Sequence, residues 1–79
     1  MRFTLYGRAD CHLCEVMLGA LAPLAVEYDF VVDHVDVDAD ATLRRRYGAR
    51  VPVLVDPEGR EICHAVLDAH AVKRRIAVE

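Results

Sequence analysis

Hydrophobic and polar positions change period near the start of the chain and so separate the first two predicted elements. Over Arg2 to Tyr6 the pattern fits a short strand, which a turn at Gly7 ends. From Cys11 onward, apolar residues recur at the spacing of one helical face. The inward-facing residues of this helix are predicted to be Leu13, Val16, Met17, Ala20, Leu21, Leu24 and Ala25. We expect Pro23 to kink the helix or to end its regular part, because proline lacks an amide hydrogen.

The rest of the pattern predicts a second strand, a short helix, a hairpin and a final helix. These are Phe30 to Val37, Ala41 to Tyr47, the strand pair Val51 to Val55 and Arg60 to Val66, and a helix that opens at Leu67-Asp68. Asp38 or Asp40 can cap the short helix, and Gly48 is expected to close it in the left-handed conformation. Asp56-Pro57-Glu58-Gly59 is a strong turn signal, and Asp68 can cap the last helix.

The predicted order is therefore βαβαββα. Two strands joined by a helix should be parallel, and a closing hairpin should be antiparallel. The sequence thus predicts an α/β fold with a mixed four-stranded sheet flanked by helices. A chain of 79 residues leaves room for a single domain, which we assign to residues 1–79.

Composition and charge argue against two classes of partner. The longest apolar run, Val16 to Val26, is too short to span a membrane and is interrupted by Gly19 and Pro23. A net charge of −3 disfavours general nucleic-acid binding, and the basic clusters at 44–46 and 73–75 suit the ends of helices. The amino terminus lacks the pattern of a signal peptide, so we expect a cytoplasmic protein without nucleic-acid or membrane partners.

The sharpest chemical signal is Cys11-His12-Leu13-Cys14, at a predicted strand-to-helix junction. Unpaired amide groups and the helix dipole favour a thiolate at Cys11. Cys14 follows one turn later and is close enough to attack a mixed disulfide formed at Cys11. Three cysteines, an odd number, disfavour a structural disulfide framework. The pattern indicates that the pair accepts and passes on a disulfide.

Two segments resemble the thioredoxin superfamily, and more closely its small glutaredoxin-like branch. Residues 6–14 resemble the active-site segment, and residues 50–54 resemble the Val-Pro segment. The resemblance covers essentially the whole chain and implies a thioredoxin-like, glutaredoxin-type fold. It also implies a thiol-disulfide oxidoreductase with Cys11 as nucleophile and Cys14 as resolving residue. By the same resemblance, Pro52 should be cis and Val51 should present its backbone to the substrate.

Three further residues are candidates for substrate binding. Arg8 can bring positive charge beside Cys11. Tyr6 is either a core aromatic or a wall of the substrate groove. The resemblance implies that Asp68 can anchor the amino group of a γ-glutamyl moiety, so glutathione is a possible co-substrate. No bound cofactor is expected, and the partners would be a protein or small-molecule disulfide and glutathione or a thioredoxin-type reductant.

The chain departs from its family in the residues around these segments. His12 and Leu13 replace the frequent Pro-Tyr pair, and Ala65-Val66-Leu67 replaces the usual Gly-Gly segment. The first departure removes the rigidity of proline and an aromatic side chain, and the second concerns the segment that would meet glutathione.

Other interpretations of the cysteines stay open. The pair can be structural thiols, half of a zinc site, or part of a non-catalytic binding or metal-carrier module. A zinc site needs two more ligands, and Cys63-His64 is a poor source because neighbours in a strand face opposite ways. We therefore predict no metal site. We expect Cys63 to be a small buried residue and His34, His64 and His70 to be surface or half-buried.

Overall fold

The computed structural model describes residues 1–78, and its helices and strands follow the predicted order. The elements are β1 (Arg2–Gly7), α1 (His12–Tyr28), β2 (Val31–Asp36), the 3-10 helix η1 (Val37–Ala39), α2 (Ala41–Tyr47), β3 (Val53–Val55), β4 (Glu61–His64) and α3 (Ala69–Ala77). The two hairpin strands are shorter than predicted, and η1 was not predicted. Across residues 1–78, no helix has the length and apolarity that a membrane crossing requires.

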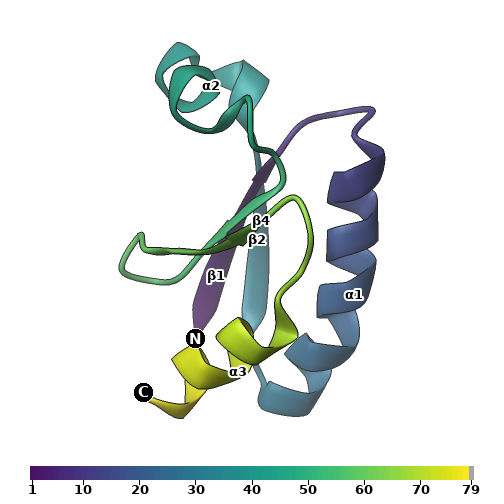
Figure 1. Cartoon of the computed structure of the whole chain (residues 1–79), viewed down its shortest axis with the longest axis vertical. Helices are drawn as coiled ribbons and strands as arrows, with labels where there is room; N and C mark the ends of the chain where they lie inside the picture. The colour runs from purple at the N-terminus through teal and green to yellow at the C-terminus, as the bar shows by residue number, and fades with distance from the viewer. Residues whose placement is uncertain (79) are drawn as a thin grey trace.

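The four strands form one mixed sheet in the order β2-β1-β3-β4. β1 runs parallel to β2 and antiparallel to β3, and β4 is antiparallel to β3. The predicted α/β fold with a mixed four-stranded sheet is therefore confirmed. Figure 1 shows α1 alongside the sheet, with α2 at one end of the molecule and α3 at the other.

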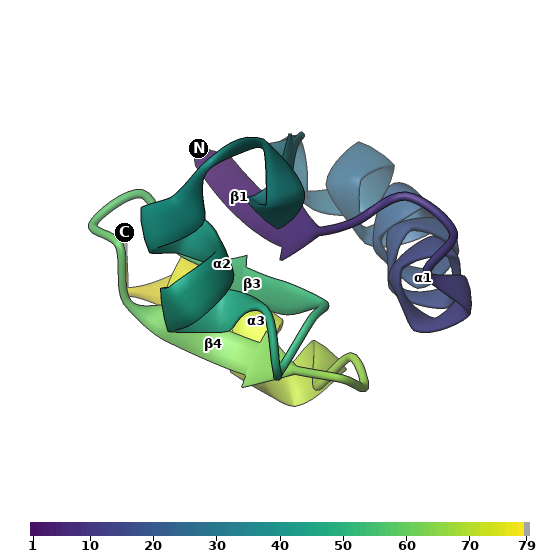
Figure 2. The same ribbon diagram turned by 90° about the horizontal axis from the view of Figure 1, so that it is seen from above.

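The core consists of two hydrophobic clusters, one on each face of the sheet, because alternate residues of a strand face opposite ways. One cluster joins β1 and β3 to α1 and α3 through Phe3, Leu5, Met17, Leu21, Phe30, Leu54 and Val72. The other joins the sheet to α2 through Val37, Tyr47, Val53 and Val55. Figure 2 shows α1 and α2 well apart in the view from above. The sheet is thus covered by helices on both faces.

Two local predictions about helix ends need correction. Of the two alternatives expected at Pro23, the end of the helix does not occur, because α1 continues to Tyr28; the kink stays a prediction. The carbonyl that would accept the missing bond belongs to Gly19, which is exposed, so solvent can satisfy it. Gly48 is not left-handed, since its φ is −56° and its ψ is −32°. Glycine is required there by space instead, because a Cβ would collide with the carbonyl of Arg44.

In the first turns of α1, two residues that were predicted to face the core are exposed instead. Met17 and Leu21 are buried as predicted. In contrast, 47% of Leu13 and 53% of Val16 are exposed. The helix therefore offers more apolar surface near Cys11 than the core covers.

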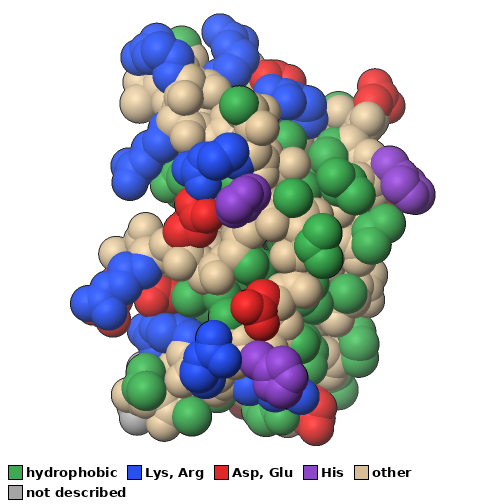
Figure 3. Space-filling model, viewed as in Figure 1, with side chains coloured by type: hydrophobic (Ala, Val, Ile, Leu, Met, Phe, Trp, Pro, Cys, Tyr) green, Lys and Arg blue, Asp and Glu red, His purple; other side chains and the backbone are tan. Residues whose placement is uncertain are grey.

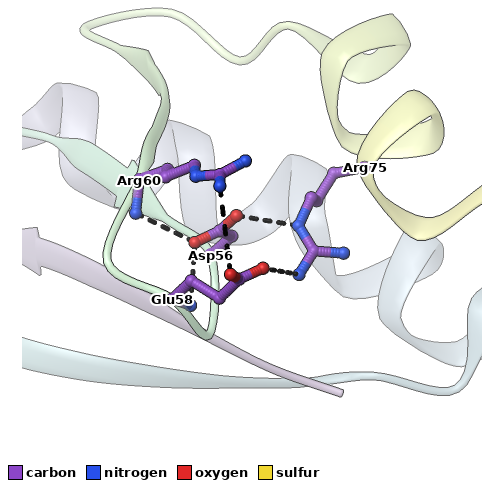
Figure 4. Close-up of polar contacts among 4 residues, drawn as sticks. All are labelled: Asp56, Glu58, Arg60 and Arg75. Atoms are coloured by element: carbon purple, nitrogen blue, oxygen red, sulfur yellow. Dashed lines mark hydrogen bonds and ion pairs between the residues drawn. The ribbon is translucent and has the colours of Figure 1, made fainter. Parts of the chain in front are cut away.

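A buried carboxylate ties the β3–β4 turn to α3 (Figure 4). Asp56 is 3% exposed, and its side chain accepts hydrogen bonds from the amides of Glu58 and Arg60, both at 2.9 Å. The guanidinium of Arg75 donates to the other carboxylate oxygen at 2.7 Å and also bonds Glu58 at 3.3 Å. Burial raises the pKa of Asp56, but Arg75 and the two amides lower it on balance.

We expect Asp56→Asn to lower the free energy of unfolding by about 1–3 kcal/mol at neutral pH, because it leaves Arg75 without its buried charge partner. The folded-state pKa of Asp56 lies below its unfolded value. The stabilisation is therefore complete above about pH 5 and is lost as pH falls through the folded-state pKa. Urea unfolding at several pH values measures the difference between variant and wild type.

Asp33→Asn is the matched control, because Asp33 pairs with Arg2 at an exposed site where 62% and 44% of the two side chains are accessible. It should cost less than about 1 kcal/mol. Equal losses in the two variants, or a loss at Asp56 that does not shrink in acid, would contradict the role of the buried carboxylate.

Candidate redox site at the start of α1

Cys11 is the residue that caps the amino end of α1. Its backbone is extended, with φ −106° and ψ 104°, and its sulfur accepts a hydrogen bond from the amide of Cys14 at 3.2 Å. The first amides of a helix have no partner within the helix and carry partial positive charge. Negative charge on the Cys11 sulfur is therefore stabilised where it forms.

The two cysteines form a disulfide across the first turn of α1, with their Cα atoms 5.2 Å apart. They differ sharply in exposure: Cys11 is half-buried, whereas Cys14 is 1% exposed. This difference follows from helical geometry, because Cys14 lies on the same helix face as the buried Met17. One sulfur can meet a reagent from solution, and the other lies beneath it.

The loop before Cys11 is fastened to the α2 side of the molecule by Arg8. The guanidinium of Arg8 donates to Asp38 at 3.1 and 3.3 Å and to the carbonyl of Gly48 at 3.0 Å. The hydrogen bond from Arg8 lowers the pKa of Asp38, and the same contact raises the pKa of Arg8. Arg8 thus holds the loop in place. Asp10 then turns the chain into α1 with a positive φ of 56°, which aspartate tolerates better than most residues.

The Val51–Pro52 peptide bond is cis, and it leads into β3. Pro52 is buried, and its carbonyl accepts a hydrogen bond from the amide of Ala65 at 2.8 Å. Ala65 has a positive φ of 64°, an uncommon conformation for a residue with a Cβ. The segment after β4 is therefore fixed to the proline at one defined position.

An apolar groove of about 310 Å³ runs between α1 and the segment that follows β4. It is lined by Leu13, Val16, Met17 and Ala20 from α1 and by Ala65, Val66 and Leu67 opposite. In Figure 3, hydrophobic side chains gather on this side of the molecule, while Lys and Arg side chains crowd the end that carries α2. The groove begins at Leu13, the neighbour of Cys14, and reaches the residue bonded to Pro52.

Other residues named from the sequence lie at separate places. Tyr6 stacks on Tyr47, with ring centroids 4.2 Å apart, in the cluster beneath α2. Asp68 caps α3 by accepting a hydrogen bond from the amide of Ala71 at 3.0 Å. Cys63 is a free, half-buried cysteine that packs against the hydrophobic cluster between the sheet and α1. Burial raises the pKa of the Cys63 thiol.

The structure thus brings together Cys11, Cys14 and the apolar groove, and links the groove to Val51-Pro52. Sequence reasoning did not identify the exposed groove residues Leu13, Val16 and Val66. Helical spacing placed the first two on the apolar face, but spacing does not reveal which part of that face the rest of the chain covers. Among residues 1–78, no three His, Cys, Asp or Glu side chains are grouped so that they could hold a metal ion.

Comparison with known proteins assigns the chain to a family. The family model described as a glutaredoxin-like domain (DUF836) matches residues 2–77. An uncharacterized protein of Mycobacterium tuberculosis is 35% identical over 78 residues, which cover 92% of this chain and 79% of the relative. A protein of Nitrosomonas europaea, solved by NMR, is 36% identical with a TM-score of 0.86, covering 94% of this chain and 88% of the other.

A more distant likeness concerns the fold. Thioredoxin 1 from Thermosipho africanus is 16% identical and has a TM-score of 0.67, covering 99% of this chain and 97% of that one. The predicted thioredoxin-like fold is therefore confirmed. Because the family model spans nearly the whole chain, the protein belongs to the glutaredoxin-like domain (DUF836) family.

Proposed function

We propose that the protein is a cytoplasmic thiol-disulfide oxidoreductase in which Cys11 is the nucleophile and Cys14 the resolving residue. The observation that carries the proposal is the pairing of a half-exposed sulfur at the amino end of a 17-residue helix with a buried sulfur one turn later. A helix amino terminus lowers the cost of a thiolate, and the thiolate is the nucleophile in disulfide exchange. The family membership supports the same chemistry.

The proposed reaction proceeds by two exchanges. The thiolate of Cys11 attacks one sulfur of the substrate disulfide, forms a mixed disulfide and releases the other substrate sulfur as a thiolate, which takes a proton from solvent. Cys14 loses its own proton and attacks Cys11. The Cys11–Cys14 bond forms, and the second substrate sulfur leaves with its electron pair. The substrate is reduced by two electrons and the cysteine pair is oxidised; the reverse sequence oxidises a dithiol.

The apolar groove supports a substrate with hydrophobic groups next to its disulfide. Leu13 and Val16 expose apolar surface beside the cysteine pair, and burying such surface is favourable by roughly 25 cal/mol per Å². We propose that a protein or small-molecule disulfide lies along this groove, with the backbone of Val51 orienting it near Cys11. In this proposal Tyr6 and Arg8 would not contact the substrate. Tyr6 would hold the end of β1 by stacking on Tyr47, and Arg8 would hold the loop before Cys11 by its hydrogen bonds.

We propose glutathione or a thioredoxin-type protein as the reductant that regenerates the dithiol. No resident cofactor enters the proposal. Asp68 is the acidic group nearest in sequence to the groove segment and would attract the amino group of a γ-glutamyl moiety. Its carboxylate also caps α3, so its two roles must be separated in a test.

Redox titration with thiol alkylation tests the exchange reaction. We expect Cys11 and Cys14 to interconvert reversibly between dithiol and disulfide at a potential between about −300 and −120 mV. Cys14→Ser should accumulate a mixed disulfide at Cys11, and Cys11→Ser should form none. Cys63→Ser, which removes the remaining cysteine, should titrate like the wild type.

Failure of the pair to form a reversible disulfide in that range would contradict the proposal. Metal analysis of protein purified without added metal provides an independent check. Stoichiometric metal that is lost in Cys14→Ser would favour a metal carrier instead. Full activity of Cys14→Ser on glutathionylated substrates would show that Cys14 is not needed for resolution.

Asp68→Asn tests glutathione recognition without removing the helix cap, because asparagine caps helices as well as aspartate does. If Asp68 binds the amino group of glutathione, the KM for glutathione should rise about two- to fivefold, as expected for an exposed ion pair. Activity with dithiothreitol, which has no amino group, should not change. An unchanged KM for glutathione would exclude Asp68 as the anchor.

A further inference from the structure

The side chain of His34 reaches toward the buried sulfur of the pair. A Cβ placed on Gly7 would lie 2.9 Å from the Sγ of Cys14 and 2.9 Å from the Nε2 of His34. The two atoms flank the same point and so cannot be separated by more than twice that distance. Such a separation permits proton transfer directly or through a single water molecule.

Strand register and a missing side chain bring the two groups together. In the parallel pair of β1 and β2, Leu5 lies opposite His34 and Gly7 lies opposite Asp36. Alternate residues share a face, so His34 extends from the same side of the sheet as Leu5 and Gly7, which is the side that α1 covers. Gly7 has no Cβ to fill the space between the imidazole and Cys14. Glycine at this position leaves the approach open.

The chemistry of Cys14 requires such a neighbour. Cys14 must lose its proton before it can attack a mixed disulfide, because the thiolate is the nucleophile. Cys14 is 1% exposed, and burial in apolar surroundings disfavours the thiolate. His34 is exposed to solvent at the same time as it faces Cys14. Imidazole changes its protonation near neutral pH and is the side chain most often used to move protons.

We propose that His34 accepts the proton of Cys14 during resolution of the mixed disulfide, a role that rests on the proposed function. The proton of the Cys14 thiol moves to the neutral imidazole at Nε2, directly or through water. The sulfur of Cys14 then bonds to the sulfur of Cys11, and the substrate sulfur leaves with the electron pair of the broken bond. The imidazolium returns its proton to solvent, and the substrate thiolate is protonated from solvent.

Two charged groups near this position, Asp36 and Arg8, form hydrogen bonds of their own. From β2, Asp36 shares the face of His34 and accepts a hydrogen bond from the amide of Asp38 at 2.9 Å. From the end of β1, Arg8 bonds Asp38 and Gly48. From α1, the titratable groups at this end are the two cysteines and the exposed side chains of His12 and Glu15. The negative charge of Asp36 would stabilise the imidazolium that forms. The positive charge of Arg8 would destabilise it, but the carboxylate of Asp38, which Arg8 binds, offsets this charge.

Single-turnover kinetics with a nitrobenzoate disulfide, which releases a coloured thiolate in each exchange step, tests the role of His34. All proteins carry Cys63→Ser so that two cysteines remain. The first release reports attack by Cys11, and the second reports resolution by Cys14. We expect His34→Gln to slow the second release about tenfold to a hundredfold near neutral pH. The first release should be unchanged, and His70→Gln, at an exposed position of α3, should behave like the parent protein.

The pH profile and chemical rescue distinguish proton transfer from packing. In the parent protein, the rate of the second release should level off once the imidazole is neutral, whereas in His34→Gln it should keep rising with pH. Free imidazole should restore the second release in His34→Ala and leave the first release unchanged. If the parent protein shows both releases and His34→Gln has the same pH profile, the proton-acceptor role is overturned. If the parent protein shows no second release, the proposed function itself fails.

Discussion

The parallel pairing of β1 with β2 determines where the sulfur atoms lie. Parallel strands cannot be joined by a tight turn, so α1 must carry the chain back along the sheet before β2 can begin. Because residues 8–11 are the whole connection between the two elements, α1 must start near the carboxyl end of β1. Cys11 therefore occupies the one place in the helix where backbone amides lack partners.

The same constraint gives the two cysteines different surroundings. A helix that lies on a sheet has one buried side, and Cys14 lies on that side, whereas Cys11 precedes the first helical turn and has an extended backbone. Cys14 falls over the sheet beside Gly7, whereas Cys11 lies at the open end of the helix. Apolar surface beyond the sheet, at Leu13 and Val16, lines the groove instead of the core. The reactivity of Cys11, the burial of Cys14 and the apolar groove thus all follow from the way α1 connects the parallel strands β1 and β2.

Local signals in the sequence predicted most of the fold and the centre of the site. The change of period at Cys11, the cap at Asp68 and the turn at Asp56 depend on neighbouring residues, so the chain itself reveals them. The role of Gly48 escaped prediction because it depends on the close approach of the Arg44 carbonyl, and residue types do not reveal such a distance. The position of His34 depends on the register between two strands, which periodicity alone does not determine.

The third cysteine, Cys63, bears on how the protein withstands oxidative stress. Cys63 is half-buried on β4, and its burial keeps the thiol protonated. Oxidants such as peroxides react with thiolates far more readily than with thiols, so irreversible sulfur oxidation should spare this position. A sulfur that stays protonated also competes poorly for the exchange partners of Cys11. The raised pKa of Cys63 therefore disfavours its entry into the pairing of the other two cysteines.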